Sequence, residues 1–253
     1  MFDTVAVLAD VHCVLPAFDA VLAEPAVAAA ERIVLAGDVT VGPQPEATIA
    51  RVRELGDRVV WVSGNCERVT AELARGTREP DENTALAAWG AVRLSDEQVA
   101  LLEALPRTVT LPVRGLGEVL FCHATPRDDE EFVLVDSAIP RWQEVLDGLP
   151  DAVTTVVCGH THMPFMRLVD RLAVVNPGSV GMPYGTSGAH WALLGGSDEP
   201  VIQLRRTRYD VRTAEEQIRE ACDYPKIGEW IEGYLRTNAS DLEALEVFGK
   251  RAT

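Results

Sequence analysis

The sequence predicts an α/β fold, and three observations favour it. Apolar runs of strand length alternate with stretches whose apolar residues recur every three or four positions, as in amphipathic helices. The chain has 253 residues, 47% of them hydrophobic, which is enough apolar material for one large domain with a sizeable core. Several apolar runs end directly in Asp, Asn or His, and open α/β folds place their ligands at the carboxyl ends of strands.

Five apolar runs are predicted strands, and each is followed by side chains that can bind a metal ion. Run 5–9 is followed by Asp10 and His12, run 33–36 by Asp38, and run 59–62 by Asn65. Run 119–122 is followed by His123, and run 153–158 by His160 and His162. Side chains two positions apart can emerge close together where the chain leaves a strand. Because Asp, Asn and His recur without a Cys-x-x-Cys pair, the pattern favours a first-row divalent metal at one sheet edge.

Helices are predicted where apolar residues are spaced like one helix face. Helices are predicted at 15–22, 49–55 and 142–149, and one or two more within 213–237. A further helix is predicted to begin at the capping box Ser95–Gln98. Pro16 can start the first helix, and Pro25 can stop it. Short strands are expected at 165–168, 172–175, 190–194 and 201–204, and the segment 76–83 is expected to be an exposed loop.

The charge of the chain limits its partners. The formal net charge of −16 argues against binding an extended nucleic acid, which requires a basic stripe. A small phosphate-ester or nucleotide substrate stays compatible, because bound metal ions can reverse the local field. The start of the chain lacks a signal-peptide pattern, and no apolar run is long enough to cross a bilayer. We therefore expect a cytoplasmic protein without membrane partners, and we leave a homo-oligomer open.

The ligand pattern resembles one known family. The fragments are Asp10-x-His12, Gly37-Asp38, Gly64-Asn65, His123 and Gly159-His160-Thr161-His162, in this order and each after a predicted strand. A single histidine beside a strand is usually structural, but all five fragments together resemble the signature of the calcineurin-like metallophosphoesterases. The turn Asn176–Gly181 and the tail from Tyr209 resemble the small bacterial phosphodiesterase branch of that family.

The resemblance implies the fold in more detail than periodicity does. It implies a four-layer α-β-β-α sandwich with two packed mixed sheets and flanking helices. A single metallophosphoesterase domain would cover 1–253, with a helical C-terminal tail from about 212. The early strands would form a mostly parallel portion and the later strands a more mixed one. Apolar periodicity alone does not distinguish this fold from a doubly wound sheet.

The resemblance also implies a site for two divalent metal ions. One ion would be held by Asp10, His12, Asp38 and His162, and the other by Asp38, Asn65, His123 and His160. Two cations about 3.5–4 Å apart need an anionic bridge, which the Asp38 carboxylate would supply. Manganese is favoured, while iron, cobalt, nickel, zinc and magnesium stay open.

The implied activity is hydrolysis of phosphate esters by a metal-activated hydroxide, and we favour a phosphodiesterase that acts on small diesters. Asp38, Asn65 and His123 are the expected catalytic residues. Asn65 and Arg127 are the expected substrate contacts, because a guanidinium can bind two phosphate oxygens. The alternative for Arg127 is an ion pair with a nearby acid. Two other functions stay open: a phosphomonoesterase or protein phosphatase, and a noncatalytic metal-binding interaction module, although the complete ligand set counts against the latter.

Cys66 marks a departure from monoester-hydrolysing relatives. Many of those relatives have a histidine after the Gly-Asn pair, where it can protonate the leaving alcohol, whereas this chain has Gly64-Asn65-Cys66. A thiol with a reference pKa of about 8.5 is mostly protonated at neutral pH. Cys66 is expected to pack beneath the metal loop, and the missing acid favours diesters with good leaving groups. Five cysteines, an odd number without zinc spacing, do not indicate a disulfide framework.

Overall fold

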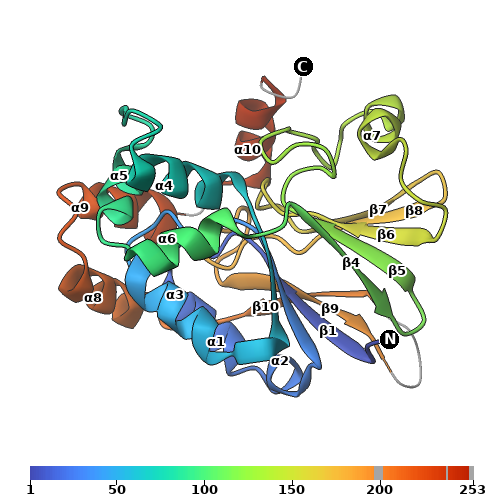
Figure 1. Cartoon of the computed structure of the whole chain (residues 1–253), viewed down its shortest axis with the longest axis horizontal. Helices are drawn as coiled ribbons and strands as arrows, with labels where there is room; N and C mark the ends of the chain where they lie inside the picture. Colours follow the sequence, from blue (N-terminus) through green and yellow to red (C-terminus); the bar gives the residue numbers. More distant parts are fainter. Residues whose placement is uncertain (197–201, 238, 251–253) are drawn as a thin grey trace.

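Two five-stranded mixed sheets pack face to face, and helices cover the outer face of each (Figure 1). The computed structural model describes residues 1–196, 202–237 and 239–250. The predicted four-layer α-β-β-α sandwich is therefore confirmed, and a doubly wound single sheet is excluded.

The first sheet has the strand order β10-β9-β1-β2-β3. Its strands are β1 (Thr4–Leu8), β2 (Arg32–Ala36), β3 (Val59–Val62), β9 (Ala189–Gly195) and β10 (Ile202–Thr207). β1, β2 and β3 run parallel, whereas β9 pairs antiparallel with both β1 and β10. The predicted parallel early portion and mixed later portion are confirmed. Of the strand expected at 201–204, Val201 lies outside the described residues.

The second sheet has the strand order β4-β5-β6-β8-β7. Its strands are β4 (Thr108–Val113), β5 (Gly117–Cys122), β6 (Val153–Val157), β7 (Phe165–Val169) and β8 (Leu172–Asn176). β5, β6 and β8 run parallel in the centre, and β4 and β7 pair antiparallel at the two edges. Both sheets therefore contain parallel strands whose carboxyl ends can share one site.

The helices include those expected from the sequence and several others. They are α1 (Leu15–Leu22), α2 (Pro25–Ala29), α3 (Pro45–Glu54), α4 (Asn65–Arg75), α5 (Ala85–Ala91), α6 (Asp96–Glu103), α7 (Ile139–Leu146), α8 (Val211–Ala221), α9 (Ile227–Trp230), α10 (Asp241–Gly249), a 3-10 turn η1 (Gly56–Arg58) and a π-helical segment η2 (Ile231–Arg236). The Ser95 capping box opens α6, where the Gln98 amide donates to Ser95 Oγ over 3.2 Å. Pro25 follows α1 as expected and also begins α2. α10 lies within the helical tail expected from about 212, but beyond the helices predicted individually within 213–237.

Alternation along β1 divides its side chains between two cores. Val5 and Val7 pack against the second sheet, where Phe121 also lies, whereas Ala6 and Leu8 pack beneath the helices. Successive side chains of a strand point to opposite faces of the sheet, so one buried strand contributes side chains to two cores. A third core lies between the second sheet and α7 (Figure 1).

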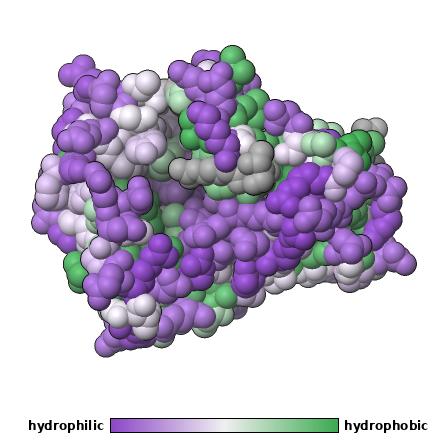
Figure 2. All heavy atoms as spheres, turned by 90° about the horizontal axis from the view of Figure 1, so that it is seen from above, coloured by the Kyte–Doolittle hydropathy of each residue, from purple (hydrophilic) through white to green (hydrophobic). Residues whose placement is uncertain are grey.

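The surface is polar, in line with the acidic composition. Figure 2 looks down on the upper end of the molecule as drawn in Figure 1 and shows a mostly hydrophilic face with a hollow in it. Among the described helices, none combines the length and the apolar character needed to cross a bilayer.

Candidate metal centre

Five parallel strands, three from the first sheet and two from the second, place the seven predicted ligands at one site. The ligand atoms of Asp10, His12 and His162 lie within 4.8 Å of one another, and so do those of Asp38, His123 and His160. We call these the first and the second ligand group. Asn65, the first residue of α4, joins the second group, because its Oδ1 lies 3.1 Å from His123 Nε2.

Asp38 lies between the two groups. Its Oδ1 is 3.3 Å from His123 Nε2, and its Oδ2 is 4.0 Å from His12 Nε2. The residue is buried, at 3% exposure. One carboxylate therefore reaches both groups, as a bridging ligand between two cations must.

The first group presents lone pairs that face each other. His12 Nδ1 lies 3.2 Å from the Val41 carbonyl, and His162 Nδ1 lies 2.8 Å from the Met182 carbonyl. A carbonyl only accepts, so both Nδ1 atoms donate, and in the neutral form of each ring the Nε2 lone pair faces inward. These two Nε2 atoms are 3.1 Å apart. The pair needs a positive charge between its lone pairs, so the donor set fits a metal ion.

The second group has the same character. His123 Nδ1 donates to the Ala36 carbonyl over 2.9 Å, which leaves Nε2 facing Asn65 Oδ1, Asp38 Oδ1 and His160 Nδ1. The other ring nitrogen of His160, Nε2, is buried and has no hydrogen-bond partner among the described residues. Asn65 Oδ1, Asp38 Oδ1 and, in the neutral ring, His123 Nε2 are acceptors that face one another, so this group also fits a cation.

The pKa values show how strongly the second group attracts positive charge. Burial disfavours the charged form of His123, but the nearby Asp38 and Asp10 carboxylates outweigh burial and raise the pKa of His123 to about 10. Although burial opposes it, the His123 contact also holds the pKa of Asp38 well below its usual range. Burial and the His123 charge lower the pKa of His160 to about 4. His160 is thus neutral, as metal binding requires.

The backbone is strained at the site. Five of the seven predicted ligands have positive φ: Asp10 at 55°, His12 at 46°, Asp38 at 53°, His160 at 65° and His162 at 58°. Such a conformation costs about 1–3 kcal/mol for a non-glycine residue and persists where the surroundings enforce it. The concentration of this strain at one strand edge supports a functional role for that edge.

Glycines let the loops approach one another closely. A Cβ on Gly37, whose φ is 84°, would lie 2.4 Å from His123 Nδ1. A Cβ on Gly64 would lie 2.3 Å from Asp38 Oδ1. Real Cβ contacts are not that short, so the glycine before Asp38 and the glycine before Asn65 are steric requirements of the site.

Glu67 organises the Asp38 loop, a role not predicted from the sequence. Its buried carboxylate accepts hydrogen bonds from the backbone amides of Asp38, Val39, Thr40 and Gly64, at 2.8–2.9 Å. Burial and the Asp38 charge raise the pKa of Glu67. The sequence signal is an acid three residues after Gly64, the N3 position of a capping box at the start of α4.

The Asn176–Gly181 turn braces the other loops. Asn176 Nδ2 donates to the Gly159 carbonyl over 2.7 Å, just before His160. Ser179 Oγ donates to the Asp10 carbonyl over 2.7 Å and accepts from the Met182 amide at the same distance. The turn expected from the sequence therefore also positions two ligand loops.

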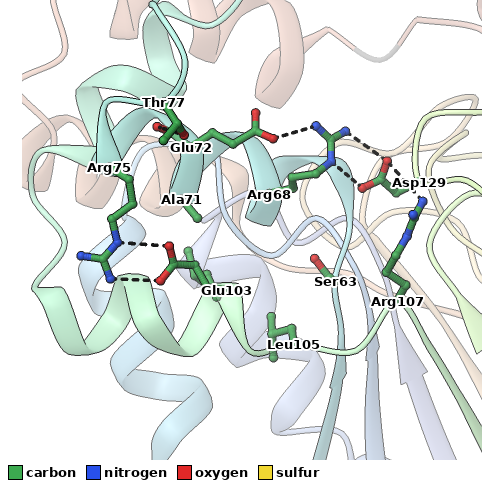
Figure 3. A pocket seen from close by; sticks show the side chains of 11 residues that line it. Ser63, Arg68, Ala71, Glu72, Arg75, Thr77, Glu103, Leu105, Arg107 and Asp129 are labelled. Atoms are coloured by element: carbon green, nitrogen blue, oxygen red, sulfur yellow. Dashed lines mark hydrogen bonds and ion pairs between the residues drawn. The ribbon is translucent and has the colours of Figure 1, made fainter.

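A half-buried ion pair ties the Asn65 helix to the loop after His123. Arg68, one turn after Asn65 on α4, donates from Nε and Nη2 to the Asp129 carboxylate over 2.8 and 3.0 Å (Figure 3). Burial opposes ionisation of Asp129, but Arg68 lowers its pKa. The pair lines a pocket of about 340 Å³ beside Ser63 (Figure 3). This bridge helps to keep Asn65 within reach of His123.

Cys66 and Arg127 both have protein partners. Cys66 is buried, its Sγ donates to Asp38 Oδ2 over 3.0 Å, and burial raises its pKa well above the usual range. Arg127 donates to Glu131 over 2.6 and 3.0 Å and to Glu144 over 2.8 Å. The Arg127 guanidinium thus forms ion pairs with nearby acids, which is the alternative to a substrate contact. Its role as a substrate contact stays a prediction.

Comparisons with known proteins agree with this geometry. The sequence model of the calcineurin-like phosphoesterase superfamily domain matches residues 4–198. An uncharacterized protein of Methanocaldococcus jannaschii is 25% identical over 240 residues, which cover 85% of this chain and 91% of that protein.

Solved structures show the same fold. A metallophosphoesterase from Sphaerobacter thermophilus is similar with a TM-score of 0.69 at 24% identity, covering 87% of this chain and 94% of that one. A hypothetical protein from Pyrococcus horikoshii is similar with a TM-score of 0.75 at 20% identity, covering 93% and 99%. On the match to the family model over most of its length, the chain belongs to the calcineurin-like phosphoesterase superfamily.

Proposed function

We propose that this chain is a phosphodiesterase that uses two divalent metal ions to hydrolyse small phosphate diesters. The observation that carries the proposal is the pair of ligand groups, in which inward-facing nitrogen and oxygen donors lie on either side of the Asp38 carboxylate. Metal-dependent hydrolysis of phosphoesters is the chemistry of the superfamily, and these donors fit it.

We assign the ligands as the sequence predicts. Asp10, His12, Asp38 and His162 would hold one ion, and Asp38, Asn65, His123 and His160 the other. The bound ions would supply positive charge to the phosphate and a hydroxide nucleophile. Asp38 would hold the ions together, and the Asn65 Nδ2 amide would orient a nonbridging phosphate oxygen. His123, whose Nδ1 donates to the Ala36 carbonyl, would act through the ion that its Nε2 holds. The glycines and Glu67 would keep these donors in place.

The contacts of Cys66 support diesters over monoesters. A buried thiol that donates to Asp38 and has a raised pKa is a packing group rather than a poised acid. Without an acid at this position, the leaving alcohol must depart with little proton assistance, which favours esters with acidic leaving groups. Among the described residues, His190 is the one histidine outside the two groups, and it contacts Thr186.

The test compares matched mono- and diesters. Metal-loaded protein should hydrolyse bis(p-nitrophenyl) phosphate with a higher kcat/KM than p-nitrophenyl phosphate, and complete chelation should abolish both activities. Cys66→His should raise the rate on esters with poorer leaving groups about tenfold, because it restores an acid. A clear wild-type preference for the monoester, or full activity after chelation, would overturn the proposal.

Arg127→Ala separates the two interpretations of Arg127. If Arg127 only pairs with Glu131 and Glu144, KM for the diester should change less than about threefold, whereas the predicted substrate contact requires a larger rise, with metal content unchanged in both cases. Steady-state kinetics and metal analysis check this, with Arg141→Ala as the control because Arg141 pairs with the same two glutamates. A tenfold rise in KM for Arg127→Ala alone would instead establish a substrate contact.

Three finer points remain predictions of the sequence. They are manganese as the resident metal, the cytoplasm as the compartment, and the assignment of 1–253 to a single domain with a helical tail. The shared core between the two sheets supports the single domain.

A further inference from the structure

A cavity of about 580 Å³ opens beside the first ligand group and has no role in the chemistry so far. His12, a member of the first ligand group, lines it together with Val41 and Met182. The carbonyls of these two residues fix the rings of His12 and His162. The cavity is therefore continuous with the metal centre, and its volume lies within the usual range for small-molecule pockets.

The outer wall of this cavity is aromatic. Trp230 and Tyr234 lie with ring centroids 5.7 Å apart, and Tyr224 adds a third ring. Trp230 is buried, whereas 45% of the Tyr234 surface is exposed. The lining also includes Leu86, the exposed Asn83, and the exposed charged residues Glu82, Lys226 and Glu229. Flat aromatic surfaces with a few polar groups at the rim suit a planar ring that stacks and forms hydrogen bonds at its edge.

The chain segment that forms this wall lies beyond the family match. The match ends at residue 198, whereas Tyr224 lies just before α9, Trp230 ends α9 and Tyr234 lies in η2. The π-helical geometry of η2 is rare and is frequent at functional sites. The wall thus lies outside the part of the chain that the family model matches and beside the metal centre.

We propose that this cavity binds a planar aromatic substituent of the phosphate ester, a nucleobase or an aryl ring, and that Tyr234 and Trp230 determine this specificity. The proposal rests on the proposed function, because it names the organic part of the diester that the metal centre would cleave. The phosphate would lie at the ligand groups, and the ring would stack between the aromatic wall and Leu86.

The test uses diesters that share one leaving group and differ in the second substituent. The p-nitrophenyl esters of thymidine 5′-phosphate, phenyl phosphate and methyl phosphate provide a nucleobase, an aryl ring and neither. Wild-type kcat/KM should be about tenfold higher for the two aromatic esters than for the methyl ester. A preference for the thymidine ester alone would identify a nucleobase, and equal preference would identify any planar ring.

Variants of the aromatic wall then test whether its rings cause the preference for aromatic esters. Tyr234→Ala should abolish most of the aromatic preference, while Tyr234→Phe should retain it, because the ring is kept. Gly233→Trp gives a second route, because a Cβ on Gly233 meets no atom within 4 Å and its side chain would fill the cavity. Val92→Ala, at an exposed site outside the cavity, is the matched control and should leave all rates unchanged. Circular dichroism verifies folding of each variant.

Equilibrium binding separates this proposal from the proposed function. Calorimetry should detect tighter binding of thymidine 5′-phosphate than of methyl phosphate, with the difference lost in Tyr234→Ala. If no diester is hydrolysed but this difference persists, the phosphodiesterase assignment fails and the cavity assignment stands. If diesters are hydrolysed without an aromatic preference, or if Tyr234→Ala and Gly233→Trp leave that preference intact, the cavity assignment is overturned.

Discussion

Asp38→Asn is expected to lower kcat for phosphodiester hydrolysis on the order of 10³-fold, equivalent to about 4 kcal/mol at the transition state. In the wild-type chain the Cys66 backbone amide donates to Asp38 Oδ1 over 2.8 Å. The substitution keeps the size of the side chain and one oxygen that can accept this hydrogen bond. It removes the negative charge that lies between the two ligand groups. Two cations would then repel each other without a bridging anion, so both should bind more weakly.

Asp10→Asn is the matched comparison for Asp38→Asn. Asp10 is equally buried but belongs to the first ligand group only. Metal analysis should therefore find about two ions per wild-type chain, a loss confined to one ion in Asp10→Asn, and a loss of both in Asp38→Asn. If Asp38→Asn keeps two ions and its wild-type kcat, Asp38 is not the bridging ligand.

The ligand loops could be predicted from the sequence because their signal is local. Each buried parallel strand is a short apolar run, and the polar residue that ends it must lie at the carboxyl edge. Asp38 and His123 are 85 residues apart in sequence but follow strands that end at one place. The number of sheets has no such local signal, because strands buried in one sheet or in two have the same apolar pattern. That part of the prediction depended on the family resemblance.

Other features depend on contacts between distant segments and could not be predicted. The aromatic wall joins Tyr234 to the His12 loop across more than two hundred residues, and no spacing rule connects them. Helix α10 lies in the expected helical tail, and the capping box of Ser240 and Glu243 at its start is a sequence signal for where it begins. The ion-pair partners of Arg127 could not be predicted either. Several acids lie near it in sequence, and the sequence does not show that Glu131 and Glu144 are the ones that pair with it.

Glu67 is the second residue whose replacement should have a large effect. Each carboxylate oxygen accepts two backbone amides: Oε2 those of Asp38 and Gly64, and Oε1 those of Val39 and Thr40. In Glu67→Gln one oxygen becomes an NH₂ group that faces two amide donors. A buried donor without an acceptor costs about 1–3 kcal/mol, so the free energy of unfolding should fall by about 3 kcal/mol.

The same substitution should weaken metal binding by about 10–100-fold, because the amides that it disturbs hold the Asp38 loop in its strained conformation. Unlike the loss of Asp38, this loss leaves every ligand in place, so excess metal should restore most of the activity. Glu72→Gln on the same helix is the control: Glu72 makes only partly exposed ion pairs with Arg68 and Arg78, which contribute about 0–1 kcal/mol. Denaturant unfolding and metal titration measure both effects. Equal stability and equal metal affinity in Glu67→Gln and Glu72→Gln would show that the Glu67 hydrogen bonds do not maintain the site.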